Sequence, residues 1–149
     1  MADLTLIRRS SSTLPAKPSP GFAGRICLVG PTVTDDWRLI RSLRRDHQVT
    51  LIERAAWIGT GRCLEGVDVL VLEATRGESF GPLLRGLKLR HPGLVVVLAE
   101  GGASQQEIAA AFRLGARDYF PAKSRGLLLE RIRHLCRQRR TTASDRPLH

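Results

Sequence analysis

Residues 67–98, VDVLVLEATRGESFGPLLRGLKLRHPGLVVVL, contain two apolar segments of strand length with a helix-like segment between them. The segments 67–72 and 94–98 are almost entirely apolar, as is typical of strands covered on both faces. Between them, apolar side chains recur at helical spacing up to the turn at 91–93, namely Phe80, Leu83, Leu84 and Leu87. This order predicts two parallel strands joined by a crossover helix.

The same alternation continues on both sides of this unit. Further strands are predicted at residues 25–29, 49–52 and 118–120. The first of them precedes a predicted helix at 35–45, whose inner face is expected to carry Trp37, Ile40 and Leu43. The stretch 55–64, which follows the second strand, is only weakly periodic.

The C-terminal half carries two more helix signals. Ser104 and Glu107 form a capping box, which predicts a helix with three inward residues, Ile108, Ala111 and Phe112. Gly115 follows as a left-handed helix stop, and a last helix at 124–139 is expected to bury Leu128, Ile132, Leu135 and Cys136. The pattern predicts an α/β fold with a five-stranded parallel sheet of flavodoxin-like order and helices on both faces.

The length of 149 residues fits one domain. We expect this domain at residues 24–139, after a flexible basic leader at 1–23 that is rich in Pro, Ser and Gly and before a disordered tail at 140–149. The net charge is +10, and residues 131–149 alone hold six basic and one acidic side chain, or +5 (6 − 1). The basic C-terminal helix and tail could bind nucleic acid, and the alternative is a solvated charged face.

Several residue types argue against metal, disulfide and membrane chemistry. The three cysteines form no CxxC pair, the four histidines lack ligand spacing, and no apolar run is long enough to cross a bilayer or to serve as a secretory signal. We therefore expect a cytoplasmic protein without a metal site. Asp35 and Asp36 lie where carboxylates cap a helix, and Trp37 and Trp57 are expected to pack inside.

Three stretches of the sequence carry a family pattern: GARDYF at 115–120 with the basic amphipathic helix after it, DVLVLEATRGESFGPLL from Asp68, and HPGLVVVLAE at 91–100. Together they resemble response-regulator receiver domains of the chemotaxis type. The resemblance covers about residues 25–138. It implies a (βα)5 receiver fold and a role in two-component-type (phosphorelay) signal transduction or transcriptional regulation.

The resemblance also implies a phosphorylation site, from which this sequence departs. In that family, two acidic residues after the first strand bind Mg²⁺, an Asp that ends the third strand accepts a phosphoryl group, and a hydroxyl and a Lys after the last two strands hold it. The equivalent residues here are Gly30 and Pro31, then Glu73, then Ala99 or Glu100, and finally Ala122. No cofactor is expected, and the missing carboxylates argue against Mg²⁺ binding. A shift of one residue would aim Lys123 into the pocket.

We therefore predict a stand-alone pseudo-receiver that is not phosphorylated and is not an enzyme. It is expected to dock on a protein partner or on a second copy through its fourth helix, fifth strand and fifth helix. The candidate docking and switch residues are Tyr119, Phe112, Arg117, Arg131 and Arg133.

Several alternatives stay open at this stage. Glu73 either mimics a phosphorylated state or is a solvated carboxylate at a strand end. A small basic protein that binds nucleic acid on a receiver scaffold is the alternative function. A working phosphoacceptor at Glu73 or Asp68 is the weakest interpretation, because Asp68 begins its strand.

Overall fold

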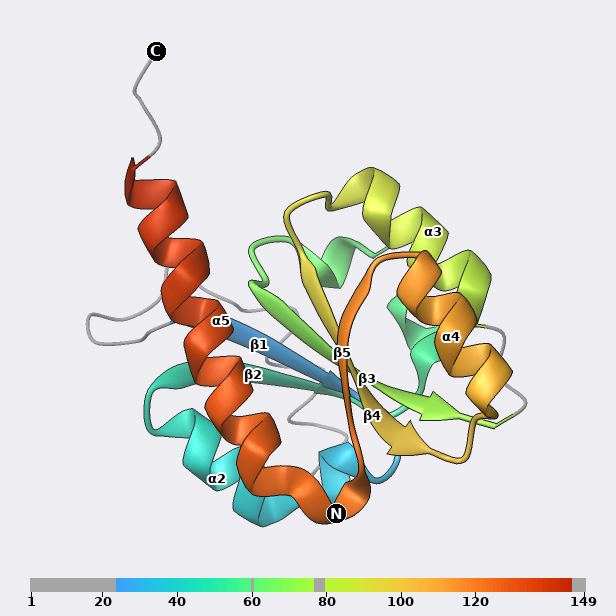
Figure 1. Ribbon diagram of the computed structural model, residues 1–149. Coiled ribbons are helices and arrows are strands. Elements are labelled where there is room, and N and C mark those ends of the chain that lie inside the picture. The colour runs from blue at the N-terminus through green and yellow to red at the C-terminus, as the bar shows by residue number, and fades with distance from the viewer. Residues whose placement is uncertain (1–23, 60, 77–79, 146–149) are drawn as a thin grey trace.

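The computed structural model describes residues 24–59, 61–76 and 80–145 (Figure 1). Five strands form one sheet in the order β2-β1-β3-β4-β5, and neighbouring strands pair in parallel. Their bounds are β1 Gly24–Val29, β2 His47–Ile52, β3 Val69–Thr75, β4 Val95–Gly101 and β5 Ala116–Phe120. The predicted flavodoxin-like order is confirmed.

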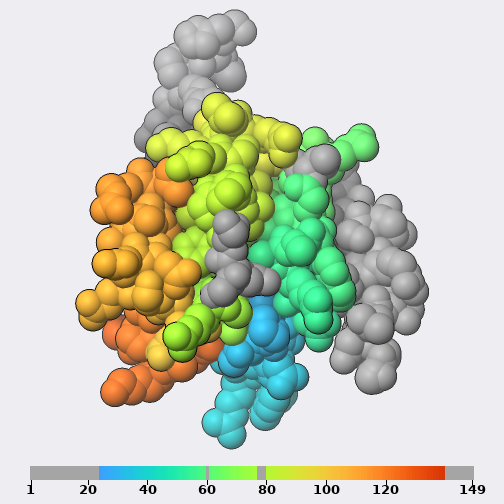
Figure 2. Space-filling model, turned by 90° about the vertical axis from the view of Figure 1, so that its right-hand side faces the viewer, coloured from blue at the N-terminus to red at the C-terminus, as the bar shows by residue number. Residues whose placement is uncertain are grey.

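Within the described ranges, four helices cover the two faces of the sheet. Figure 1 shows α2 and α5 on one side and α3 and α4 on the other. The helix bounds are α2 Trp37–Arg44, α3 Phe80–Arg90, α4 Gln105–Arg113 and α5 Arg125–Asp145. The described part of the chain also contains short 3₁₀ helices, namely η1 Val33–Asp35, η2 Ala55–Ile58, η3 Arg62–Leu64 and η4 Ala122–Ser124. Figure 2 shows the face on which α4, α3 and the segment containing η2 and η3 lie in a row.

The core follows from the apolar strands. Residues 69–72 of β3 are at most 1% exposed, because helices cover both faces of the sheet. One half of the core packs β1 and β3 against α2 and α5, including Leu43, Leu128 and Ile132. The other half packs the opposite face of the sheet against α3, α4 and the 3₁₀ segment, including Leu64, Phe80 and Leu84.

The local signals at α4 are confirmed. Ser104 Oγ accepts a hydrogen bond from Glu107 N at 3.1 Å, and Glu107 Oε1 accepts one from Ser104 N at 2.7 Å. Gly115 has a φ of +111°, which fits its prediction as the helix stop. Both signals are local, so short-range sequence rules were sufficient to find them.

Three of the aromatic side chains predicted to point inward are exposed, whereas Phe80 is buried as predicted. Trp37 is 61% exposed, Trp57 52% and Phe112 41%. In α2 the inner stripe consists of Leu39, Ile40 and Leu43, and Trp37 lies outside it at the first helical position. The weakly periodic stretch after β2 folds into η2 and η3 rather than a full helix, and only Ile58 of η2 is buried.

The last helix is longer than expected. It runs to Asp145 rather than ending at residue 139, because the first proline or glycine after Gly126 is Pro147. The predicted leader at 1–23 and the last four residues of the predicted tail lie outside the described residues. Among the described residues, no helix is long and apolar enough to cross a bilayer.

The cysteines are free thiols. Cys27 and Cys136 are fully buried and Cys63 is half-buried. Burial, with a smaller contribution from Cys63, raises the pKa of the Cys27 thiol well above its usual range, and burial also raises the pKa of Cys63. Cys27 and Cys63 are therefore poor nucleophiles at neutral pH.

Candidate functional site

The candidate site lies where the carboxyl ends of the parallel strands meet. The strand register places Glu73 of β3 beside Ala99 of β4, and Ala99 beside Phe120 of β5. A cleft of about 380 Å³ opens next to Glu73 on the β1 and β2 side. It is lined by Val29, Gly30, Pro31, Glu53, Arg54, Ala55, Glu73 and Thr75. The fold thus brings Gly30, Pro31 and Glu73 together, as the sequence predicts.

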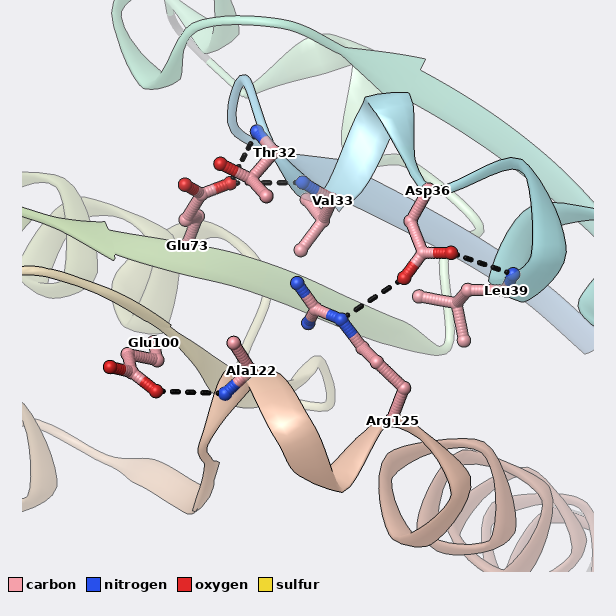
Figure 3. Close-up of polar contacts among 8 residues, drawn as sticks. All are labelled: Thr32, Val33, Asp36, Leu39, Glu73, Glu100, Ala122 and Arg125. Atoms are coloured by element: carbon pink, nitrogen blue, oxygen red, sulfur yellow. Dashed lines mark hydrogen bonds and ion pairs between the residues drawn. The ribbon is translucent and has the colours of Figure 1, made fainter.

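Glu73 is not a solvated carboxylate. It is 5% exposed, and its Oε1 accepts hydrogen bonds from Thr32 N at 2.8 Å and from Val33 N at 3.0 Å (Figure 3). The carboxylate therefore caps the loop that leads into η1, and this contact ties β3 to the loop after β1. The solvated alternative is wrong, because the loop folds over the end of β3 and covers the side chain.

Gly30 is required by this close approach. A Cβ atom on Gly30 would lie 2.3 Å from Glu73 Cβ and 2.5 Å from Glu73 Oε1, and the Gly30 φ is +136°. Only glycine adopts this backbone conformation readily and also leaves room for the glutamate. A residue with a side chain, such as the acidic residue of the receiver pattern, cannot occupy this position beside Glu73.

The residues present do not fit a magnesium ion. Gly30 and Pro31 supply no carboxylate, and one oxygen of Glu73 already accepts two amide hydrogen bonds. Within the described ranges, no group of three or more His, Cys, Asp and Glu side chains could hold a metal. The arrangement lacks the set of oxygen ligands that Mg²⁺ requires.

The ends of β4 and β5 also lack the phosphate-holding groups of the receiver pattern. Ala99 is fully buried beside Glu73, whereas Glu100 points away and its Oε1 accepts a hydrogen bond from Ala122 N at 2.8 Å (Figure 3). Lys123 is exposed in η4 and makes no ion pair with a described residue. Lys123 is not among the residues that line the cleft beside Glu73.

A second charged contact at this edge was not foreseen. Asp36 Oδ1 accepts a hydrogen bond from Leu39 N at 3.1 Å, so the predicted capping role is confirmed. The same carboxylate pairs through Oδ2 with Arg125 Nε at 3.1 Å, and Figure 3 shows Arg125 reaching from the start of α5 toward Asp36. Only the cap has a local signal, because the ion pair joins residues 89 positions apart in sequence (125 − 36).

The predicted docking residues divide into two groups. Tyr119 is half-buried on β5, and Phe112 and Arg117 are exposed on α4 and β5. Burial, and secondarily the charge of Glu100, raises the pKa of Tyr119. Arg131 pairs with Asp118 of β5 at 2.6 Å, so it lies on the β5 side of α5.

Arg133 does not belong to this surface. It pairs at 3.7 Å with Asp46, which lies between α2 and β2. Arg131 and Arg133 are two residues apart on a helix, so their side chains point in very different directions. They reach toward opposite edges of the sheet, since β5 and β2 are its two outer strands.

Comparisons with known proteins find similarity in structure only. No family model matches the sequence, and no curated protein matches it. An orphan response regulator of H. pylori shares 18% identity with a TM-score of 0.66, covering 79% of this chain and 100% of that chain. A protein from Burkholderia pseudomallei described as pilus assembly-related shares 20% identity with a TM-score of 0.64, covering 82% and 96%.

A third structure belongs to an atypical orphan response regulator, whose structure revealed a phosphorylation-independent regulatory mechanism. It shares 18% identity with a TM-score of 0.60, covering 76% of this chain and 95% of that chain. At these identities the comparisons establish the fold alone. The receiver resemblance of the sequence is confirmed at this level: the chain has the five-stranded α/β fold of response-regulator receiver domains.

Proposed function

We propose that this chain is a receiver-like signalling module that works without phosphorylation and catalyses no reaction. The observation that carries the proposal is the buried Glu73 carboxylate, which occupies the phosphoacceptor position and is bonded to Thr32 N and Val33 N. One oxygen of this carboxylate already accepts two amide hydrogen bonds, and the two positions that carry the metal-binding carboxylates in the receiver pattern are Gly30 and Pro31 here. The phosphorylation-independent orphan regulator with the same fold supports this interpretation.

Glu73 would then hold the domain in one conformation. A phosphoryl group on a receiver adds negative charge at the end of the third strand, whereas here the Glu73 side chain lies there and is bonded to the loop after β1. The module would act in two-component-type signal transduction or transcriptional regulation by binding, either to another protein or to a second copy. The surface proposed for docking consists of Phe112, Arg117, Tyr119 and Arg131.

Treatment with acetyl phosphate and Mg²⁺ tests the first half of the proposal. The intact mass of the full chain is expected to stay unchanged, because no residue in the pocket can accept and hold a phosphoryl group. A receiver domain with a complete acidic site serves as the positive control in the same tube. A stable increase of about 80 Da, the mass of one phosphoryl group, would show that the chain is a working phosphoacceptor.

Affinity capture from the native cells tests the docking surface. A Tyr119→Ala, Arg131→Ala variant is expected to lose the partners recovered by the wild-type chain, or to lose self-association in sedimentation. Arg133→Ala is the matched control, because it also removes an arginine of α5 that is paired with an aspartate but lies on the other side of the helix. If the control loses binding and the double variant keeps it, the docking surface lies elsewhere.

A further inference from the structure

The outer face of α2 is a basic surface without acidic neighbours on the same helix. Residues 37–45 read WRLIRSLRR and contain four arginines and no acidic residue. The inner stripe of Leu39, Ile40 and Leu43 is buried. Three arginines lie on the opposite, exposed side at intervals of about one helical turn: Arg38, Arg41 and Arg45. Trp37 lies at the edge of the same side.

The charges on this face are not neutralised by neighbours. Within the part of the chain that the structure describes, Arg38, Arg41 and Arg45 make no ion pair. In α5, by contrast, the arginines at 131, 133 and 139 pair with Asp118, Asp46 and Asp68. Three arginines of the predicted basic C-terminal helix are thus paired with aspartates, whereas three arginines of the α2 face make no such pair within the described residues.

An exposed aromatic ring adds a second binding element. Trp37 is 61% exposed, and the Arg38 guanidinium lies 5.5 Å from the centroid of its ring. The flat face of an exposed indole is suited to stacking on an unpaired base. Arg38 and Trp37 together offer a cation and a stacking surface at one end of the basic face.

We propose that the outer face of α2 binds single-stranded nucleic acid, with the arginines on phosphates and Trp37 stacked on a base. Arg38 to Arg45 span about 10 Å of helix, over which a strand presents several phosphates. All the cations are arginines, whose planar guanidinium matches phosphate geometry and stacks better than lysine. A membrane is a poorer fit, because the apolar stripe of α2 is buried against the sheet and leaves only Trp37 to insert.

This surface is independent of the one proposed for protein docking. α2 covers one face of the sheet and α4 the other (Figure 1). The docking residue Arg131 lies on the β5 side of α5, because it pairs with Asp118. Asp46, which follows α2, pairs instead with Arg133 on another side of α5. Loss of nucleic acid binding would therefore leave the docking proposal intact, and the reverse also holds.

Fluorescence anisotropy of the full chain with a labelled 20-nucleotide oligo-dT, measured over a range of salt concentrations, tests the proposal. The Arg38→Gln, Arg41→Gln variant removes two exposed charges. The negative slope of log affinity against log salt is therefore expected to become shallower by about 1.4, at about 0.7 per phosphate contact on a single strand. Trp37→Ala is expected to weaken binding on the order of tenfold through lost stacking. Thermal unfolding checks that both variants remain folded.

The matched control is Arg85→Gln, Lys88→Gln, which removes two exposed charges from α3 on the opposite face. This control is expected to bind like the wild-type chain. Equal losses in the two double variants would show that net charge alone drives binding, and would overturn the proposal. The proposal is also overturned if oligo-dT does not bind to the wild-type chain. It is likewise overturned if the α2 variants weaken binding to vesicles that contain phosphatidylserine but leave oligo-dT binding unchanged.

Discussion

Gly30→Ala is expected to lower the free energy of unfolding by about 3 kcal/mol or more, from backbone strain and overpacking together. The new Cβ would lie 2.3 Å from Glu73 Cβ, a distance that real contacts do not reach, and Gly30 has a φ of +136°. The backbone and Glu73 would both have to move, and the move would break the amide contacts of the Glu73 carboxylate. Urea denaturation followed by circular dichroism measures the loss.

Gly59→Ala is the control for the backbone part of this effect. Gly59 also has a positive φ, +60°, but a Cβ there would meet nothing within 4 Å. Its substitution should therefore cost only the strain of the backbone, and the difference between the two variants reports the contact with Glu73. Equal losses at both positions would mean that Gly30 and Glu73 do not approach each other as described.

Glu73→Ala is expected to destabilise the chain by about 3 kcal/mol, because two backbone donors lose a charged acceptor. The Val33 amide is buried and cannot turn to water, whereas Thr32 is exposed and can be partly solvated. Glu73→Gln keeps an oxygen in the place of Oε1, so it should cost only about 1 kcal/mol. Both values come from the midpoint and slope of urea unfolding curves.

Glu53→Ala is the matched control for this prediction. Glu53 lines the same cleft but is exposed, so its loss should change stability by less than about 0.5 kcal/mol. A small effect of Glu73→Ala, comparable to that of Glu53→Ala, would restore the solvated interpretation of Glu73. An equally large loss in Glu73→Gln would show that the charge rather than the hydrogen-bond geometry matters.

The fold was predictable because its signals are local or follow directly from periodicity. The apolar strand 94–98, the capping box at Ser104 and the stop at Gly115 each depend on a few neighbouring residues. The sheet order then follows from the repeated alternation of strand and helix. The exposure of Trp37 was missed because the helix pattern alone allows either edge of the apolar stripe to face the core.

The sequence predicts which residues lie at the candidate site, but not the hydrogen bonds and ion pairs that they make. Gly30, Pro31 and Glu73 could be placed together, because the ends of parallel strands meet at one edge. The hydrogen bonds of Glu73 to the loop at 32–33, and the pairing of Arg125 with Asp36, depend on side-chain conformations across 40 to 89 residues of sequence. No local pattern encodes such long-range contacts, so they emerge only from the folded chain.

Helix α5 makes ion pairs with the rest of the molecule along most of its length. Arg125, Arg131, Arg133 and Arg139 hold it to Asp36, Asp118, Asp46 and Asp68, which lie in four different parts of the chain. Each pair contributes little alone. The six residues from 140 to Asp145 continue the helix for about 9 Å beyond the last of these ion pairs. Through Asp118 of β5 and Asp46, which directly precedes β2, α5 is tied to both outer strands of the sheet.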